Sequence, residues 1–391
     1  MAKQPITLLF DPIPFKGGSK VATSDALNCT DANNNHYLVL TVDIEFWQQT
    51  SFYQQHNVKC QVIRPVKWLI HRHHGVGYWL NQCYFALCIL KVMLLNNVRQ
   101  LIGASGPGMD MALYLVHKLV GTPVVQFVHG SVGLSRSIGY SLTLANHVFY
   151  LNTARASISQ AIQCYYSSIT AIDNTEPLAE SYLSASHYQT FVNGIPAERW
   201  PTPSQTSMPI CFWAASLLKW KGLDLLLDAE AICHHYQPLP VTVCYIRPQQ
   251  TCLPMSLAPV ERSNIQWWED PDNLDQLRSE ASIFVSTSQS EPFGLSILEA
   301  LAAGMCVVLP QDGAYWDQHL THTQNCIKYQ PNDAESLAHA LLLATNDSSV
   351  MQRCQRNAAQ IASQYRAEVC YASIASTVGA TPTLVTQRVH E

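Results

Sequence analysis

Short apolar runs alternate with longer segments of helical periodicity along the first half of the chain. In the longer segments the apolar positions recur every three or four residues, whereas the short runs are nearly continuous in apolar residues. This alternation is typical of parallel sheets whose strands are connected by crossing helices. It predicts strands at 6–10, 37–43, 100–104, 124–129 and 147–152, and a helix over 109–121 that ends at Gly121.

A proline-rich stretch then separates this series from a second one. Prolines stand at positions 196, 201, 203 and 209, directly after a short predicted strand and turn at 190–196. Beyond them the pattern restarts, with strands expected at 209–216, 241–246, 282–288 and 306–310 and helices at 222–236, 273–281 and 295–304.

The predicted fold class is therefore α/β, with two Rossmann-like domains that face each other across a cleft. We place the N-terminal domain at residues 1–198 and the C-terminal domain at 205–365, which leaves 366–391 as the end of the last helix and a polar tail. In such folds a ligand binds at the carboxyl ends of the strands, so we expect it between the two domains.

The composition narrows the class of protein. The chain has 391 residues, of which 48% are hydrophobic and only 13% charged, and its net charge is −5. This balance argues against a general nucleic-acid-binding protein, which would carry a basic excess. The 13 cysteines include no C-x-x-C pair, which favours free thiols in a reducing compartment.

Two apolar stretches bear on targeting. The run 6–10 is too short for the core of a signal peptide, and the stretch 78–98 is interrupted by Asn, Gln and Lys. A bilayer-spanning helix needs about 20 predominantly apolar residues, so we expect neither stretch to act as a leader or a span. The predicted localisation is cytoplasmic.

The segment 288–310 carries the most informative chemistry. Glu291 follows a predicted strand, and Gly294 then leads directly into a helix. The free N–H groups of Gly294, Leu295 and Ser296 at the helix start favour an anion such as a diphosphate. Glu299 stands eight positions beyond Glu291 with apolar flanks, where an unpaired carboxylate would be costly to bury. We expect the helix to present Glu299 to a ligand with hydroxyl groups, such as a ribose; the alternative is a half-exposed helix residue.

The residues EPFGLSILEALAAG in this segment resemble the E-x7-E signature of retaining glycosyltransferases with the GT-B fold, especially glycosyltransferase family 4. The resemblance implies that Glu291 holds hydroxyl groups of the donor sugar and Glu299 the ribose of the nucleotide. It implies that the loop amides of Phe293, Gly294, Leu295 and Ser296 meet the sugar and the diphosphate. In this family the last helix also packs back toward the first domain.

A weaker match lies in FWAASLLKWKGLDLLLDA, residues 212–229, which resembles a strand–loop–helix that usually reads G-R-L-x-x-x-K-G. The resemblance places Lys221 against the diphosphate, while a solvated lysine before a helix is the alternative. Ser216 stands where the family carries an arginine that helps to stabilise the departing diphosphate. Arg247, in place of an expected glycine-rich loop, is a candidate substitute.

The first domain offers two further matches. Gly17 and Gly18 in FKGGSK resemble the family's glycine-rich loop, where the backbone approaches the donor phosphates; a plain turn is the alternative. His129 ends an apolar strand where members often carry a histidine that faces the donor sugar, although a lone histidine at such a place is often structural.

Two motifs suggest other ligands. Asp270-Pro271-Asp272 imitates a D-x-D metal motif, but it precedes a helical pattern, where Asp272 or Asn273 serves better as an N-cap. We therefore expect no metal. Gly103, Gly106 and Gly108 show the reverse of the dinucleotide-binding spacing, so NAD binding is not expected.

A basic patch precedes the apolar stretch at 78–95, and two interpretations of it stay open. The patch is either a solvated face or an interfacial surface that docks on anionic lipid. It consists of Arg64, Lys67, His71, Arg72, His73 and His74.

The predicted function is a retaining, metal-independent glycosyl transfer from a UDP- or GDP-sugar to a saccharide or a lipid-linked saccharide, in glycan or polysaccharide biosynthesis. No cofactor beyond the nucleotide sugar is expected, and peripheral contact with the inner face of the membrane is the open option on localisation. A transferase-like subunit without activity, which binds nucleotide or scaffolds a polysaccharide complex, is the alternative; a sugar-nucleotide epimerase is a third.

Overall fold

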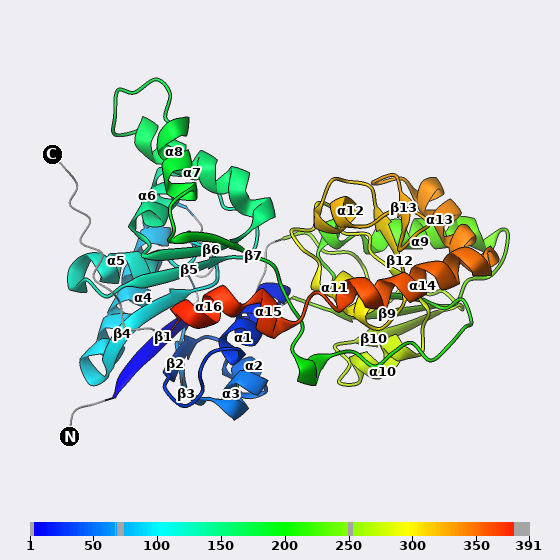
Figure 1. The fold of residues 1–391 in the computed structure, drawn as a ribbon, viewed down its shortest axis with the longest axis horizontal. Helices are drawn as coiled ribbons and strands as arrows, with labels where there is room; N and C mark the ends of the chain where they lie inside the picture. The colour runs from blue at the N-terminus through cyan, green and yellow to red at the C-terminus, as the bar shows by residue number, and fades with distance from the viewer. Residues whose placement is uncertain (1–3, 67, 69–73, 249–252, 379–391) are drawn as a thin grey trace. The chain divides into compact units, whose positions relative to one another are not determined.

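The computed structural model describes residues 4–66, 68, 74–248 and 253–378 of the chain. The chain divides into two compact units, each built on one parallel sheet (Figure 1). Unit 1 comprises residues 1–191 together with 370–391, and unit 2 comprises 192–369. The two units are described separately below.

Unit 1 contains a seven-stranded sheet of order β3-β2-β1-β4-β5-β6-β7. The strands predicted from apolar runs are all present, whereas β3 and the full extent of β7 were not predicted. β3 alternates between half-buried and exposed residues, so its sequence lacks a continuous apolar run. The strands are β1 (Pro5–Asp11), β2 (His36–Thr41), β3 (Asn57–Val62), β4 (Asn97–Gly103), β5 (Val124–Val128), β6 (His147–Leu151) and β7 (Tyr188–Phe191).

The helices of unit 1 follow the strands as crossovers. The predicted helix at 109–121 is α5, and it ends at Gly121, whose φ of 76° lies in the left-handed region that favours glycine. The helices are α1 (Gly18–Asn28), α2 (Ile44–Gln48), α3 (Ser51–Gln55), α4 (Gly75–Leu95), α5 (Met111–Val120), α6 (Arg136–Leu144), α7 (Arg155–Ser167), α8 (Glu176–Leu183) and α16 (Ala372–Thr377), with α15 (Ala367–Cys370) at the boundary with unit 2.

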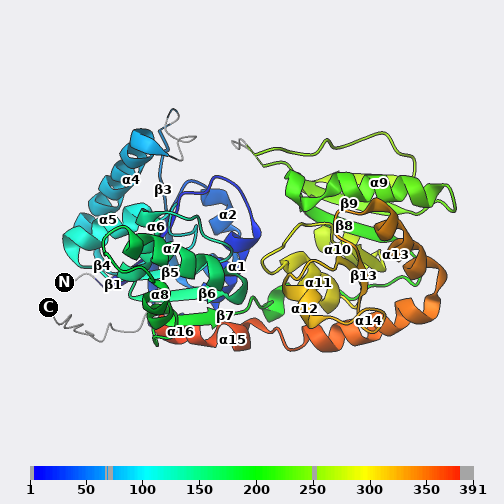
Figure 2. The ribbon, with the colours of Figure 1, turned by 90° about the horizontal axis from the view of Figure 1, so that it is seen from above.

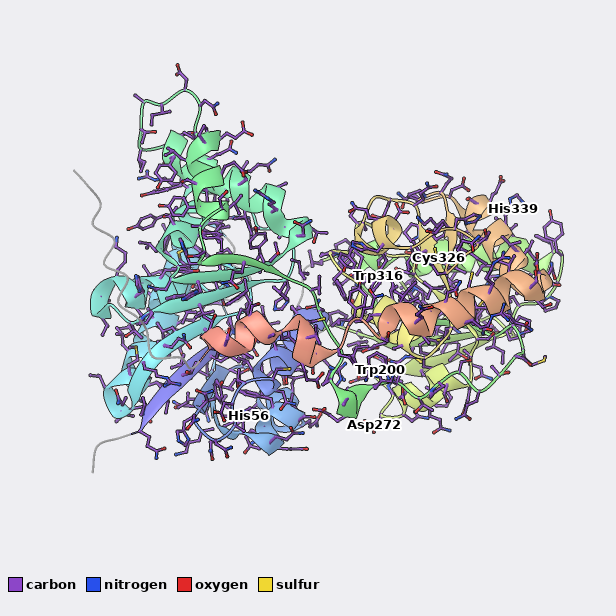
Figure 3. The ribbon with its side chains drawn as sticks, in the orientation of Figure 1. His56, Trp200, Asp272, Trp316, Cys326 and His339 are labelled. Carbon is purple, nitrogen blue, oxygen red and sulfur yellow. The ribbon has the colours of Figure 1, made fainter. Side chains whose placement is uncertain are left out.

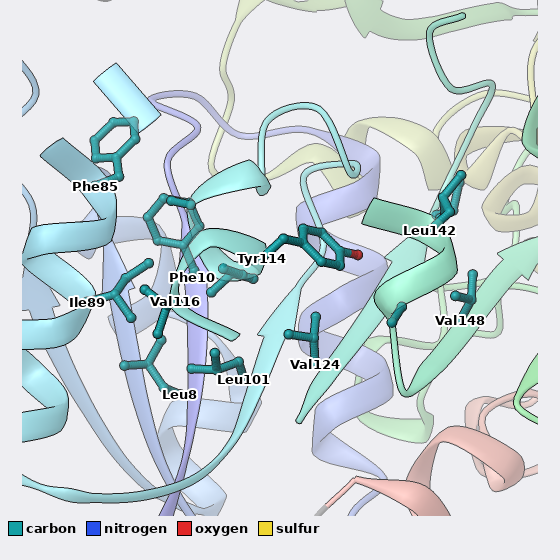
Figure 4. Packing of buried hydrophobic residues seen from close by; sticks show 14 of the residues in the cluster. Leu8, Phe10, Phe85, Ile89, Leu101, Tyr114, Val116, Val124, Leu142 and Val148 are labelled. Carbon is teal, nitrogen blue, oxygen red and sulfur yellow. The ribbon is translucent and has the colours of Figure 1, made fainter. Parts of the chain in front are cut away.

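The core of unit 1 lies between the sheet and its helices. Leu8 and Phe10 of β1 meet Phe85 and Ile89 of α4, and the Phe10 and Phe85 rings lie edge to face with centroids 5.5 Å apart (Figure 4). Among the described residues α4 is long and apolar enough to cross a membrane by length and composition, and a third of its most apolar window is buried.

Unit 2 contains a six-stranded sheet of order β10-β9-β8-β11-β12-β13. Its first strand, β8, therefore lies in the middle. β9 and β10 are added on one side of it and β11, β12 and β13 on the other, so the strand order reverses between β8 and β11 although all strands are parallel. The carboxyl ends of two such strands form the crevice in which doubly wound folds bind ligands. The strands are β8 (Cys211–Ser216), β9 (Val241–Ile246), β10 (Ile265–Glu269), β11 (Ile283–Val285), β12 (Cys306–Pro310) and β13 (Ile327–Tyr329).

The predicted strands of unit 2 correspond to β8, β9, β11 and β12, and the ranges of β9 and β12 agree with the prediction to the residue. The helices pack in pairs, with α9 against α13 and α11 against α14. They are α9 (Leu223–His234), α10 (Leu274–Ser279), α11 (Leu295–Ala302), α12 (Tyr315–His319), α13 (Ala334–Asn346) and α14 (Ser348–Ala362).

The proline-rich stretch belongs to unit 2. Ile195 forms a parallel bridge with Arg366, and the Ser204 amide donates to the carbonyl of Ala303 at 2.8 Å. Trp200, labelled in Figure 3, lies under the Arg366 guanidinium, 3.4 Å from the ring centroid. These contacts attach the stretch along its length, so the boundary between the units falls at 191–192, ahead of the prolines.

Candidate functional site

Two loops of unit 2 meet where the strand order reverses. The loop after β8 ends in a short 3-10 helix at Lys219–Lys221, and the loop after β11 runs from Ser286 to Gly294. The Gln289 amide donates to the carbonyl of Trp220 at 2.9 Å, and the Thr287 hydroxyl donates to the carbonyl of Lys221 at 2.8 Å. The two loops are thus held together by hydrogen bonds.

Gly222 explains why the first loop must end in a glycine. Its φ is 74°, and a Cβ added there would lie 2.2 Å from the carbonyl oxygen of Thr287. An L side chain is disfavoured by the dihedral angle and excluded by the contact. The glycine therefore allows the loop after β8 to approach the loop after β11.

Lys221 and Glu291, both singled out from the sequence, form an ion pair across these loops. Both side chains are largely buried, and the Lys221 ammonium also lies 4.0 Å from the centroid of the Trp220 ring. The ammonium is attracted by the carboxylate and by the ring face. The structure brings together the cation predicted for the diphosphate and the carboxylate predicted for the sugar.

Gly294 places the start of α11 beside this pair. Its φ of 82° lies in the left-handed region, and its carbonyl accepts hydrogen bonds from the amides of Ile297 and Leu298. The amides of Leu295 and Ser296 fall in the first turn, where a helix offers no carbonyl acceptor. The helix start therefore offers free amide donors where the sequence predicts an anion.

The buried side chain of Phe293 anchors this turn. Its ring is buried against Tyr315 and Trp316, with centroids 4.7 and 5.3 Å away, and the Trp316 indole donates to the carbonyl of Gly294 at 3.2 Å. The side chain of Phe293 is thus structural, and only its backbone can face a ligand. An open hollow of about 240 Å³ adjoins the turn, lined by Ser286, Ser288, Glu291, Phe293, Asp312 and Trp316 among others.

Glu299 is paired, so the premise that its carboxylate lacks a protein partner is wrong. Its Oε1 accepts from Arg199 at 3.1 Å and its Oε2 from Arg278 at 2.8 Å. The Arg278 side chain is only 7% exposed and also binds Asp275 at 2.8 Å. The two arginines hold the carboxylate in one position.

Sequence reasoning missed both arginines. Arg278 lies on α10 next to the buried Leu277, so a charged residue beside a core position was the signal. Arg199 lies in the 3-10 helix Ala197–Arg199 of the proline-rich stretch, where the prolines indicate only a boundary between the two series.

Ser216 is the last residue of β8 and is half-buried, at the carboxyl end of the strand that borders the reversal. The contacts of Arg247 do not support its role as a substitute for the arginine that Ser216 replaces. Its Nε donates to Glu269 at 3.2 Å and its Nη2 to the carbonyl of Ala258 at 2.8 Å, both toward the β10 side of the sheet.

Unit 1 contains a second hollow, of about 350 Å³, at the start of α1. Gly17 caps α1 with an extended φ of −152°, and a Cβ added there would meet nothing within 4 Å. The glycine is thus not required by sterics or by its dihedral angle, although the space in front of it is open. Gly18 is the first residue of α1. The hollow is lined by Asp11, Phe15, Gly17, Lys20, Thr23, Trp47 and Ser105 among others.

A buried ion cluster forms one wall of this hollow. The Lys20 ammonium lies 3.1 Å from Asp11 and 3.0 Å from Asp43, and it donates to the carbonyl of Ile13 at 2.9 Å. The Trp47 indole donates to Asp11 at 2.7 Å. The sequence contained a signal, because Asp11 ends the first strand and Lys20 follows the glycine pair.

His129 lies just beyond β5 and connects to the same hollow through Thr23. The Thr23 hydroxyl donates to the carbonyl of Ser19 at 2.8 Å, so it accepts from His129 Nε2 at 2.9 Å. The ring lies edge-on to Phe127 and Phe191. Burial lowers the pKa of His129 to about 4, so the imidazole is neutral at pH 7.

Nδ1 of His129 is then an acceptor. It is buried and has no hydrogen-bond partner in the part of the chain that the structure describes. A ligand hydroxyl could satisfy it, as could a water molecule.

The described residues contain no group of three or more His, Cys, Asp or Glu side chains placed to hold a metal ion. The sequence Asp270-Pro271-Asp272, which imitates a D-x-D motif, precedes α10; Asp272 is labelled in Figure 3. The N-cap of α10 is Asn273, and its side chain makes no capping hydrogen bond. Lys67, His71, Arg72 and His73 of the basic patch lie outside the described residues.

Residues 195–361 match the family described as "Glycosyl transferases group 1". Shorter segments resemble plant enzymes. A probable sucrose-phosphate synthase 3 of Arabidopsis thaliana is 30% identical over 87 residues, and a sucrose-phosphate synthase of Zea mays is 34% identical over 76. These segments cover 22% and 19% of the chain but only 8% and 7% of the relatives' own length.

Solved structures resemble the chain over nearly its whole length. The Anabaena protein HepE in complex with UDP and glucose superposes with a TM-score of 0.69 at 15% identity, covering 97% of this chain and 100% of that one. The sucrose-phosphate synthase of Thermosynechococcus elongatus superposes with a TM-score of 0.67 at 13% identity, covering 95% and 98%.

These findings bear on two predictions. The fold is that of two Rossmann-like domains, as predicted and as in the superposed structures. The match of residues 195–361 to the group 1 family supports the predicted class of enzyme, a glycosyltransferase. Membership of family 4, the retaining stereochemistry and the acceptor stay predictions.

Proposed function

We propose that the chain transfers a sugar, with retention, from a nucleotide-diphosphate sugar to a saccharide or lipid-linked saccharide acceptor in glycan biosynthesis. The observation that carries the proposal is the meeting of Lys221, Glu291 and the start of α11 at the strand-order reversal of unit 2. A group that is both anionic and rich in hydroxyls fits this arrangement, and a nucleotide sugar has both properties.

The diphosphate would bind the first-turn amides of α11 and the Lys221 ammonium. Because these groups supply positive charge without a cation from solution, the leaving diphosphate can be stabilised without a metal ion. Once Lys221 has moved to the diphosphate, Glu291 would accept hydrogen bonds from hydroxyl groups of the donor sugar. Glu299 keeps accepting capacity on both oxygens beyond its two arginines, which suits the two hydroxyls of a ribose.

His129 is proposed to contact the donor sugar: its neutral imidazole can accept a hydrogen bond from a hydroxyl at Nδ1 once the side chains that bury this atom move aside. The amides at Gly17 and Gly18 would approach the phosphates from unit 1. The complex of HepE with UDP and glucose supports a uridine nucleotide as the first donor to test.

Calorimetry with UDP, GDP and their glucose conjugates, with EDTA present, tests the proposal. Lys221→Gln should weaken binding of UDP-glucose by about 1.5–3 kcal/mol, because a charge-assisted hydrogen bond is lost. Lys219→Gln is the matched control: it removes an exposed cation two positions away that pairs with Asp224, and it should bind like wild type. Equal affinities of the two variants, or binding only with Mg²⁺ added, would count against the site.

A second candidate function is favoured by Ser216, which lacks the charge of an arginine at the end of β8. A subunit that binds nucleotide without transferring sugar would bind UDP-glucose as tightly. It would differ in releasing no UDP over time, with or without saccharide acceptors.

A further inference from the structure

Helix α4 has two apolar faces, and only one of them packs into unit 1. Phe85, Ile89 and Val92 are buried, and Figure 4 shows Phe85 and Ile89 pointing toward the core around Phe10 and Leu8. The opposite face exposes a stripe whose members recur every three, four or seven residues. The stripe consists of Val76, Leu80, Cys83, Leu87 and Leu94.

The exposure of this stripe is large. Val76, Leu87 and Leu94 are 77%, 66% and 85% exposed. Between Val76 and Leu94 the stripe runs about 27 Å along the helix, at about 1.5 Å per residue. Figure 2 shows α4 reaching beyond the rest of unit 1 at one end. A continuous exposed apolar surface of this length marks a place of contact with something else.

The charge around the stripe indicates what that contact is. No Asp or Glu occurs between residues 46 and 109, where six Lys and Arg occur, although the whole chain has a net charge of −5. Lys91 is exposed on α4 itself. Arg64 is also exposed, and its carbonyl accepts from the Tyr84 hydroxyl of α4 at 2.7 Å. Cations therefore flank the apolar stripe without acidic neighbours in the sequence.

The aromatic residues fit a membrane interface. Trp79 of α4 and Trp68, seven positions before the helix, are both exposed. Tryptophan is enriched where headgroups meet the hydrocarbon. A protein partner would not require this combination of apolar stripe, cations and exposed indoles, whereas an interfacial helix does.

We propose that α4 docks unit 1 on a membrane surface containing anionic lipids, and that it lies in the plane of the interface. Its stripe would enter the acyl boundary while Lys91 and Arg64 meet the headgroups. The helix cannot span the bilayer, because its other face forms part of the core. The proposal does not rest on the proposed transfer reaction.

Co-sedimentation of the full chain with vesicles tests it. We expect binding to vesicles of phosphatidylcholine with phosphatidylglycerol, weaker binding to phosphatidylcholine alone, and partial release by salt. The double variant Leu87→Gln/Leu94→Gln should bind about tenfold more weakly or worse, since two exposed apolar side chains are lost. Lys91→Gln should lose about fivefold. Leu257→Gln, at a similarly exposed leucine of unit 2, should bind like wild type.

Three results would overturn the proposal. They are a wild-type chain that does not bind anionic vesicles, a Leu257 variant that loses as much as the double variant, and a wild-type dimer in sedimentation velocity that the double variant dissociates. The last result would mean that a second copy covers the stripe. Calorimetry with UDP should give the same affinity for the double variant and the wild type, so failure of the donor site and of the membrane face are distinguishable.

Discussion

Replacement of Glu299 by glutamine should lower both the stability of unit 2 and its affinity for UDP. The carboxylate neutralises Arg199 and Arg278 at 3.1 and 2.8 Å. A glutamine has nearly the same shape and can still accept one hydrogen bond, but it carries no charge. Arg278 is then left largely buried with Asp275 as its remaining carboxylate.

The size of the loss follows from burial. Breaking a fully buried ion pair costs about 3–5 kcal/mol, while an exposed pair contributes about 0–1 kcal/mol. The Glu299 side chain is 17% exposed, and Asp275 compensates part of the charge on Arg278. We therefore expect the free energy of unfolding to fall by about 1–3 kcal/mol. UDP affinity should fall by a further 1–3 kcal/mol or so, since the ribose loses a charged acceptor.

Urea unfolding and calorimetry with UDP measure the two losses separately. Asp275→Asn is the matched control, because it removes the other, more exposed carboxylate of Arg278 and leaves Glu299 in place. This control should lose less than about 1 kcal/mol of stability and keep its UDP affinity.

The pattern of results decides between the roles. Loss of stability with unchanged UDP affinity would make Glu299 purely structural and refute its assignment to the ribose. Loss of affinity at full stability would instead show that the arginine contacts contribute nothing to the fold. Equal behaviour of the control and the Glu299 variant would refute the burial argument.

Three further predictions concern single residues of the proposed site. Gly222→Ala should cost about 2–4 kcal/mol of stability and weaken UDP binding, because it adds a steric clash to a left-handed φ. The control Gly313→Ala, at a φ of 75° with open space around the added Cβ, should cost only about 1–2 kcal/mol, and equal losses in the two variants would contradict the clash. Ser216→Arg should tighten UDP binding by about 1–2 kcal/mol, and no gain with the fold intact by circular dichroism would mean that the position does not face the diphosphate. Burial lowers the pKa of His129 from 6.5 to about 4, so its contribution to stability is full above pH 6.5 and is lost as the pH falls toward 4. In urea unfolding between pH 7 and pH 5, wild type should therefore lose about 2 kcal/mol more than His129→Asn, and equal losses would show that the imidazole is not held neutral.

The sequence predicted the elements with continuous apolar runs and missed those without. β9 and β12 were placed to the residue because both are largely apolar runs, buried throughout in β12 and up to the last residue in β9. β10 was missed, since Ile265–Glu269 is exposed at most of its positions and its pairing with β9 is a tertiary event. β13 has only three residues, and Lys328 interrupts its apolar run, whereas the equally short β11 is apolar throughout.

The candidate site was predictable where residues are close in the chain. The turn before α11 and the glycine at its start followed from one contiguous segment. The ion pair between Lys221 and Glu291 joins residues 70 positions apart, so no local pattern could show it. The same holds for Arg199, which reaches Glu299 across 100 positions. Long-range pairing of charges depends on the sheet order, which a single sequence does not specify.

The ion pair between Lys221 and Glu291 also bears on how a donor would enter the proposed site. An anion that draws Lys221 away leaves the Glu291 carboxylate without its cation, and a largely buried charge without a partner is costly. A nucleoside diphosphate alone imposes this cost, whereas a nucleotide sugar brings hydroxyl donors that can satisfy the carboxylate. The pair would therefore favour the intact donor over the spent nucleotide, and it would assist release of the nucleotide after transfer by closing again.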